Sequence, residues 1–192
     1  MTSSRPLSRR SLFHFGAAAA VALSPLPALA GVTRPASGRP AAPRRGTRSI
    51  NLVNLHTGEK LKTVYWKDGK YERGALREID RIMRDHRSGE VKSIDRDLVD
   101  VLHRLQRQLE TNEPFEIISG YRSPITNAAL RRNSRGVAQN SYHMRAMAID
   151  LNVSNRSLPA IRKAAIGLRS GGVGYYPRSG FVHVDVGPVR DW

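Results

Sequence analysis

The sequence GFVHVDVG, residues 180–187, alternates apolar and polar side chains. This period of two is typical of a β-strand with one buried face and one open face. The three valines of the segment form the natural core face. His183 and Asp185 lie on the opposite face, together with Phe181, because successive side chains of a strand point to opposite sides. The segment therefore predicts a core strand that presents an imidazole and a carboxylate next to each other.

A second segment, SYHMRAMAID at residues 141–150, places His143 seven positions before Asp150. The sequence MAIDLNV predicts a strand that contains Asp150, and His143 precedes it. A single histidine before a strand is commonly structural, and the pair of His183 and Asp185 could be a simple hydrogen-bonded pair. Together, however, His143, Asp150 and His183 supply the three nitrogen or oxygen ligands of a catalytic zinc site, whose fourth position stays open for water. We therefore predict a metal centre.

The apolar patterns along the rest of the chain predict an α+β fold. We expect a β-hairpin from Ile50 across the turn HTGE, and later strands at residues 115–120, 147–153, 173–176 and 180–187. Helices are expected at residues 72–87 and 95–110, after Pro124, and from an N-cap at Ser157. The predicted architecture is a mostly antiparallel sheet with helices packed on one side.

The N-terminal residues 1–30 have the composition of an export signal. The paired arginines Arg9 and Arg10 precede an apolar stretch, which ends in the small-residue cleavage site Ala28-Leu29-Ala30, and the pair is typical of twin-arginine signals. An uncleaved membrane anchor is the alternative. Residues 31–49 are rich in Pro, Gly, Ala and Arg, and predict a disordered linker. The folded domain is then expected at residues 50–192, in the periplasm.

Composition restricts the chemistry and the partners. The 192 residues include no cysteine, which excludes disulfides, thiol catalysis and cysteine-ligated zinc. The formal net charge is +16, and half of this excess comes from the first 49 residues, which contain no acidic residue. Nucleic acid is the usual partner of so basic a chain, but an exported protein rarely meets it. A carboxylate-rich polymer of the cell envelope is the better electrostatic partner.

Three segments resemble one group of enzymes. SYHMRAMAID is similar to the Ser-x-His-(x6)-Asp motif of zinc peptidases that cut bacterial cell-wall peptides, a group that includes D-alanyl-D-alanine metallopeptidases, lysostaphin-like enzymes and the fold of the hedgehog signalling domain. ISGYRSPITN resembles the segment that precedes this motif. GGVGYYPRSGFVHVDVGPVRDW, at residues 171–192, resembles the C-terminal block of the murein endopeptidase K branch. The resemblance runs in order from about residue 51 to the last residue.

The resemblance implies roles for particular residues. His143, Asp150 and His183 would be the ligands of one Zn²⁺ ion. Arg122 would bind a substrate carboxylate, although a salt bridge within the fold is the alternative. Two serines would bind substrate or steady the ligands: Ser119 and Ser141.

Two positions depart from the family pattern. Many relatives have Glu or His three residues before the last ligand, where this chain has Gly180. Asp185 is then the best candidate for the general acid and base, unless it orients His183 instead. Ala146 stands where the family usually has Gly, and the added methyl group should affect packing and not zinc binding.

The expected function is that of a zinc-dependent peptidoglycan endopeptidase. The resemblance points to cross-links between two meso-diaminopimelate residues of the stem peptides. A D-alanyl-D-alanine carboxypeptidase is the alternative within the enzyme class. A non-catalytic, zinc-stabilised module that binds the cell wall is the alternative outside it. Nucleic acid is not an expected partner, and contact with the membrane is expected only through the signal.

Overall fold

The computed structural model describes residues 46–134 and 136–192. The predicted signal at residues 1–30 and most of the predicted linker lie outside these residues, and both remain predictions. The first strand begins at Thr47, so residues 47–49, which the sequence assigned to the linker, belong to the fold. Arg48 accounts for this difference, because it pairs with Asp100 at 2.7 Å and stacks over the ring of Trp66 at 4.5 Å. Within the described residues, no helix is long and apolar enough to cross a membrane.

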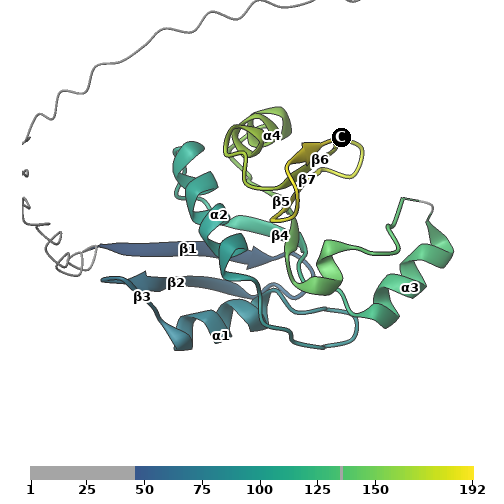
Figure 1. Cartoon of the computed structure of the whole chain (residues 1–192), viewed down its shortest axis with the longest axis horizontal. Helices are drawn as coiled ribbons and strands as arrows, with labels where there is room; N and C mark the ends of the chain where they lie inside the picture. Colours follow the sequence, from purple (N-terminus) through teal and green to yellow (C-terminus); the bar gives the residue numbers. More distant parts are fainter. Residues whose placement is uncertain (1–45, 135) are drawn as a thin grey trace, which may run out of the picture. The chain divides into compact units, whose positions relative to one another are not determined.

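The described part of the chain forms a sheet of eight strands with four α-helices (Figure 1). The strands are β1 (Thr47–Asn54), β2 (Lys60–Lys67), β3 (Lys70–Tyr71), β4 (Phe115–Ser119), β5 (Ala148–Asn152), β6 (Gly172–Tyr176), β7 (Phe181–Asp185) and β8 (Arg190–Asp191). The helices are α1 (Arg73–Ile82), α2 (Arg96–Gln108), α3 (Pro124–Asn133) and α4 (Leu158–Gly167), with a short 3₁₀ helix, η1 (Tyr142–Arg145). The strand order is β3-β2-β1-β4-β5-β7-β6-β8.

The sheet is mostly antiparallel, as predicted. Only two of its neighbouring pairs, β1 with β4 and β6 with β8, are parallel. The expected hairpin is the pair β1 and β2, which meet at the HTGE turn. The fold class is therefore α+β, in agreement with the sequence pattern.

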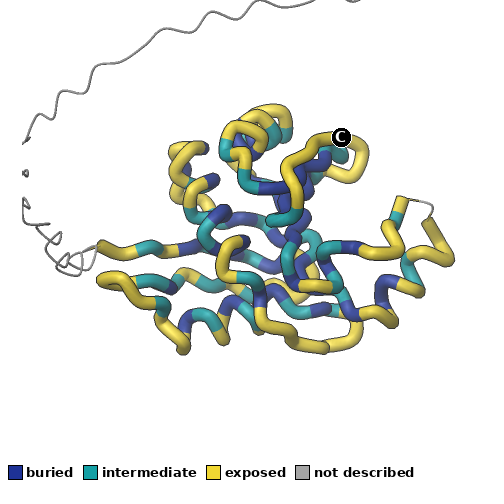
Figure 2. The backbone as a smooth tube through the Cα atoms, in the orientation of Figure 1, coloured by how far each residue is buried: buried dark blue, intermediate teal, exposed yellow. Residues whose placement is uncertain are grey.

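One face of the sheet carries the core. Figure 2 shows that buried residues gather in the central strands. Alternate side chains of these strands are buried on this face: Ile50, Leu52, Phe115, Ile117, Ile149, Leu151, Val182 and Val184. Ile79 of α1, Leu102 of α2 and Ile161 of α4 join them in a single cluster, so these three helices cover this face. The helices leave the opposite face of β5 and β7 free for polar side chains.

Helix α1 is shorter than predicted. It ends at Ile82, whereas the apolar pattern indicated a helix to residue 87. The chain turns at Asp85, whose buried carboxylate accepts hydrogen bonds from the backbone N–H groups of Arg87, at 2.9 Å, and Ser88. Gly89 then takes a positive φ of 74°, which glycine adopts without strain. The side chain of one aspartate thus replaces a further turn of helix.

The same carboxylate anchors α3. Asp85 also accepts a hydrogen bond from the backbone N–H of Ser123 at 2.9 Å. Ser123 is the N-cap of α3, and its hydroxyl accepts from the N–H of Thr126. Because Arg122 directly precedes this cap, the anchor holds the Arg122 backbone in place beside the sheet.

Candidate metal centre

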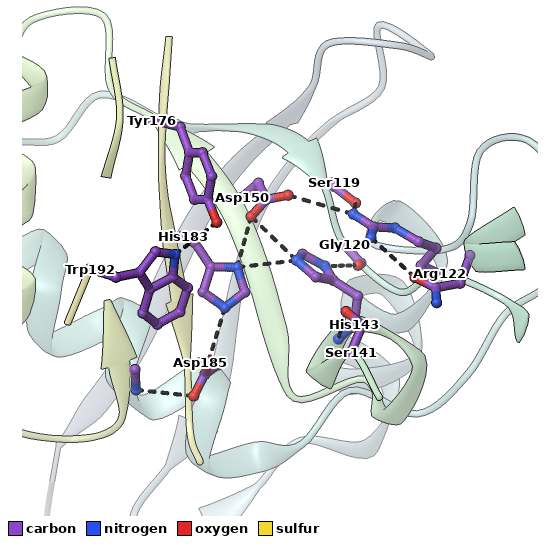
Figure 3. A network of polar contacts seen from close by, with 12 residues as sticks. Ser119, Gly120, Arg122, Ser141, His143, Asp150, Tyr176, His183, Asp185 and Trp192 are labelled. Carbon is purple, nitrogen blue, oxygen red and sulfur yellow. Dashed lines mark hydrogen bonds and ion pairs between the residues drawn. The ribbon is translucent and has the colours of Figure 1, made fainter. Parts of the chain in front are cut away.

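Two neighbouring strands place two of the predicted ligands side by side. Asp150 of β5 and His183 of β7 are partners in the strand register, on the face opposite the helices. His143 lies on η1, just before β5, and its ring faces them (Figure 3). All three residues are buried, with at most 8% of each exposed. The strand alternation seen in the sequence therefore accounts for the shared face.

The three ligand atoms form a small triangle. His183 Nδ1 lies 2.9 Å from Asp150 Oδ1, and His143 Nε2 lies 3.3 Å from the same oxygen. The two histidine nitrogens are 3.2 Å apart. Tetrahedral zinc with bonds of about 2.0–2.1 Å requires ligand atoms about 3.3 Å apart. The residues present therefore fit a metal ion of this size, and within residues 46–134 and 136–192 no other group of three such side chains does so.

The backbone orients His143. Its Nδ1 lies 2.8 Å from the carbonyl oxygen of Gly120, which makes Nδ1 the donor and leaves the lone pair of Nε2 for the centre. Gly120 has no room for a side chain, because a Cβ atom would collide with the carbonyl oxygen of Met83. Ser141 caps η1 by accepting a hydrogen bond from the N–H of His143 at 3.3 Å. The loop before β5 thus points Nε2 at Asp150.

Asp185 lies on the far side of His183 from the other two ligands (Figure 3). Its Oδ2 is 2.9 Å from His183 Nε2, and its Oδ1 accepts from the backbone N–H groups of Gly172 and Gly187. Arg190 completes its surroundings with a contact of 2.7 Å. Asp185 is fully buried and has no open side toward the centre. Of the two roles that the sequence left open, these contacts favour the orientation of His183.

The surroundings of the two buried carboxylates, Asp150 and Asp185, favour their charged forms. Burial acts to raise the pKa of Asp150, but the charges and hydrogen bonds of His143 and His183 outweigh it and hold that pKa well below its usual range. The pKa of Asp185 is also lowered: burial opposes this, while hydrogen bonds from His183 and Arg190 and from two backbone N–H groups prevail. Both carboxylates therefore remain ionised at neutral pH.

Arg122 lies beside the centre without a close ion pair. Its Nη2 is 3.7 Å from Asp150 Oδ2, and it donates to the hydroxyl of Ser119 at 3.2 Å. Its Nη1 makes a long hydrogen bond of 3.4 Å to Asn127. Its Nε is buried and has no partner within the described residues. Nη1 carries a second N–H group, so the guanidinium retains a donor for an additional acceptor.

A cleft with a volume of about 460 Å³ gives access to the three ligands. Figure 3 shows Tyr176 and Trp192 on one side of His183, whereas Arg122 and Ser119 lie beyond His143 on the other. Trp192 Nε1 donates to the hydroxyl of Tyr176 at 2.8 Å, which ties these two rings together. Among the residues that line the cleft, only the three ligands are carboxylates or histidines.

Sequence reasoning did not single out two residues of this region. Trp192 lies with its ring 5.4 Å from that of His183, and Arg190 contacts Asp185. Both belong to the C-terminal segment that pairs with β6. Their local sequence has no period, so only the position of the segment in the sheet reveals the contacts.

An α+β domain with a His/Asp/His cluster at the base of a cleft has the organisation of a metal-dependent hydrolase. Comparison with known proteins agrees with this. The family described as peptidoglycan L,D-endopeptidase MepK matches residues 42–192. The chain is 45% identical to the peptidoglycan L,D-endopeptidase MepK of Escherichia coli strain K12, over 96% of this chain and 97% of that protein. It is 42% identical to the probable peptidoglycan L,D-endopeptidase MepK of Haemophilus influenzae, over 76% of this chain and 78% of that protein.

The chain therefore belongs to the peptidoglycan L,D-endopeptidase MepK family. This membership makes it an enzyme of the metallopeptidase class, in agreement with the resemblance found in its sequence.

Proposed function

We propose that this protein is a zinc-dependent endopeptidase that hydrolyses cross-links between the stem peptides of peptidoglycan. One observation carries the proposal: three ligand atoms, 2.9–3.3 Å apart, lie at the base of a cleft that an arginine, Arg122, also lines. The names of the relatives support the substrate class.

His143 Nε2, Asp150 Oδ1 and His183 Nδ1 would hold the ion. Zinc bound there would lower the pKa of a water molecule to about 7 and would polarise the scissile carbonyl. The protein residues direct the ligand atoms at one point. Gly120 does so for His143, and Asp185 for His183. We assign Asp185 to this orienting role, because it has no access to the cleft.

Arg122 would bind a carboxylate of the substrate. In a cross-link between two meso-diaminopimelate residues, the carbon that bears the leaving nitrogen also bears a carboxylate. A guanidinium next to the metal centre matches that arrangement and fixes the position of the scissile bond. Ser119 would hold Arg122, and Ser141 would steady His143 through the cap of η1. These contacts favour supporting roles for both serines over direct substrate binding.

The preferred bond is therefore the L,D bond between two diaminopimelate residues. A terminal D-alanine also has a carboxylate beside the leaving nitrogen, so D,D-carboxypeptidase activity is the alternative that Arg122 also suits. The excess of basic residues suits an anionic wall polymer in either case. We propose that the enzyme acts in the periplasm after export, because the substrate lies there and residues 1–30 have the composition of a signal.

The test is a digest of purified peptidoglycan by residues 31–192, with zinc or with a chelator, followed by mass spectrometry of the fragments. The matched control is His143→Ala. We expect zinc-dependent loss of diaminopimelate-linked dimers, absent from the control. Loss of terminal D-alanine alone would establish the carboxypeptidase alternative. Zinc binding without any change in the fragments would leave a wall-binding module and reject the enzyme proposal for this substrate.

A further inference from the structure

We propose that the C-terminal strand β8 and the adjoining Trp192 position the metal ligand His183, and that Arg190 is a positioning residue that acts through Asp185. This inference rests on the proposed metal function of His143, Asp150 and His183. It assigns roles to Arg190 and Trp192, which lie outside the ligand motifs.

A continuous chain of contacts joins Arg190 to the ligand. Arg190 Nη2 lies 2.7 Å from Asp185 Oδ2, and its Nη1 lies 3.2 Å from Oδ1. The same Oδ2 is 2.9 Å from His183 Nε2. His183 then presents Nδ1 to the centre, 2.9 Å from Asp150. The two contacts from the guanidinium therefore fix the position of the carboxylate oxygen that contacts the imidazole.

Asp185 needs a cationic partner. The carboxylate is fully buried, and an uncompensated buried charge is strongly unfavourable. Gly172 and Gly187 donate only neutral backbone hydrogen bonds. Among the described residues, Arg190 is the only Lys or Arg side chain that forms an ion pair with Asp185. Without Arg190, the carboxylate of Asp185 would shift toward water, and its hydrogen bond with His183 would weaken.

Aromatic rings hold the guanidinium in place. Its central carbon lies 5.1 Å from the ring centre of Tyr142 and 5.0 Å from that of Trp192, both at cation–π distance. The side chain of Arg190 is nevertheless 38% exposed, so it could move if these rings did not restrain it. Tyr142 belongs to η1, the helix that carries His143. Arg190 thus contacts Asp185, the partner of His183, and Tyr142, the neighbour of His143.

Trp192 occupies a space that the sheet leaves vacant. Gly174 of β6 is the register partner of His183, and a Cβ atom there would overlap the rings of Trp192 and Tyr176. The absence of a side chain lets the indole lie beside His183. The backbone of Trp192 extends the pairing with β6: its N–H donates to Val173, and its carbonyl accepts from Tyr175. The backbone pairing of β8 does not depend on the Arg190 side chain.

The decisive variant is Arg190→Gln, compared with the unchanged chain. Zinc affinity is measured by competition with a chromophoric chelator, and Co²⁺ is added separately as a spectroscopic probe. We expect zinc to bind about 10-fold more weakly, as is common when a residue that orients a ligand is lost. The visible Co²⁺ spectrum should shift, because His183 turns relative to the ion. Circular dichroism and thermal unfolding of the metal-free protein establish that the variant is folded.

The matched control is Arg162→Gln. Arg162 pairs with Asp191 at 3.0 Å, so it contacts the same strand but not Asp185. Its zinc affinity and Co²⁺ spectrum should equal those of the unchanged chain. If Arg190→Gln does not fold, Arg190→Lys replaces it. Lysine keeps the charge but lacks the two-point grip, so a smaller loss of affinity is expected.

A double variant separates positioning from a general structural effect. If Arg190 acts through Asp185, then Arg190→Gln combined with Asp185→Asn should bind zinc no more weakly than Asp185→Asn alone. Additive losses, or an Arg190 variant that binds zinc as tightly as the control, would overturn the inference. Failure of the unchanged chain to bind zinc would instead reject the proposed metal function, and this inference with it.

Discussion

At the scale of single residues, the centre depends on which nitrogen of each histidine faces inward. Gly120 engages Nδ1 of His143, and Asp185 engages Nε2 of His183. The opposite nitrogens are therefore the ones that meet Asp150. A histidine that lacked its outer partner could rotate or bind the proton at the inner nitrogen, and either change would weaken metal binding.

The two roles considered for Asp185 predict different results for Asp185→Asn. The orienting role predicts that the variant binds zinc about 10- to 100-fold more weakly. Once saturated with metal, the variant should have the same kcat–pH profile as the parent. A general acid and base would instead leave zinc affinity intact and lower kcat with an altered pH dependence. Metal titration and a kcat–pH profile on the same preparation distinguish the two.

Arg122→Lys tests the carboxylate site. Lysine retains the charge but offers a single point of contact, so we expect kcat/KM to fall about 10- to 100-fold, as the loss of a charged hydrogen bond requires. Zinc affinity should not change, because Arg122 is not a ligand. The control is Arg131→Lys, an exposed arginine on α3. Equal kcat/KM for both variants on cross-linked fragments would remove Arg122 from substrate binding.

At the scale of elements, the connection between α1 and α3 depends on one carboxylate. Burial acts to raise the pKa of Asp85, but hydrogen bonds from Thr126, Ser123 and Arg87 prevail and lower it well below its usual range. A group with a lowered pKa stabilises the fold above its unfolded pKa of about 3.9, and that contribution is lost as the pH falls toward the folded pKa.

We therefore expect Asp85→Asn to lower the free energy of unfolding by about 2 kcal/mol at pH 7. The difference in the free energy of unfolding between variant and parent should become smaller as the pH falls from about 5 to 2. Urea unfolding of the metal-free protein across this range measures it. Glu113→Gln, at an exposed carboxylate, is the control and should show no such narrowing. A gap that stays constant with pH would mean that the charge of Asp85 does not contribute.

At the scale of the whole molecule, metal and fold are coupled. The ligands come from β5, β7 and the segment before β5, and in the metal-free state two buried imidazoles and a carboxylate are packed together. An ion that binds only the folded state stabilises it by about 2.7 kcal/mol at 100 times Kd.

Zinc at that concentration should raise the Tm by roughly 5–10 °C, and a chelator should reverse the change. Differential scanning calorimetry of residues 31–192 measures this shift. His143→Ala, which lacks one ligand, should show little response to zinc. A parent Tm that is insensitive to zinc would argue against a metal centre in the folded protein.

The sequence by itself determined the class of fold, and it singled out the three residues that the structure brings together as a group that could hold a metal ion. The alternation of 180–187 assigned the valines to the core and His183 to the other face, and the structure agrees because the period of a strand is local. It also indicated the hairpin and the position of each helix, but not the early end of α1, where Asp85 replaces a further turn.

Only the tertiary structure decided how the metal cluster is supported. Which ring nitrogen of His143 would face an ion depends on Gly120, and the two-point contact on Asp185 depends on Arg190. Gly120 directly follows β4 and Arg190 lies on β8, and contacts between segments so far apart in the sequence follow from strand order and register, which no local pattern encodes. The period of a strand reveals which side chains share a face. The neighbours that they meet on that face are set by the packing of the whole sheet.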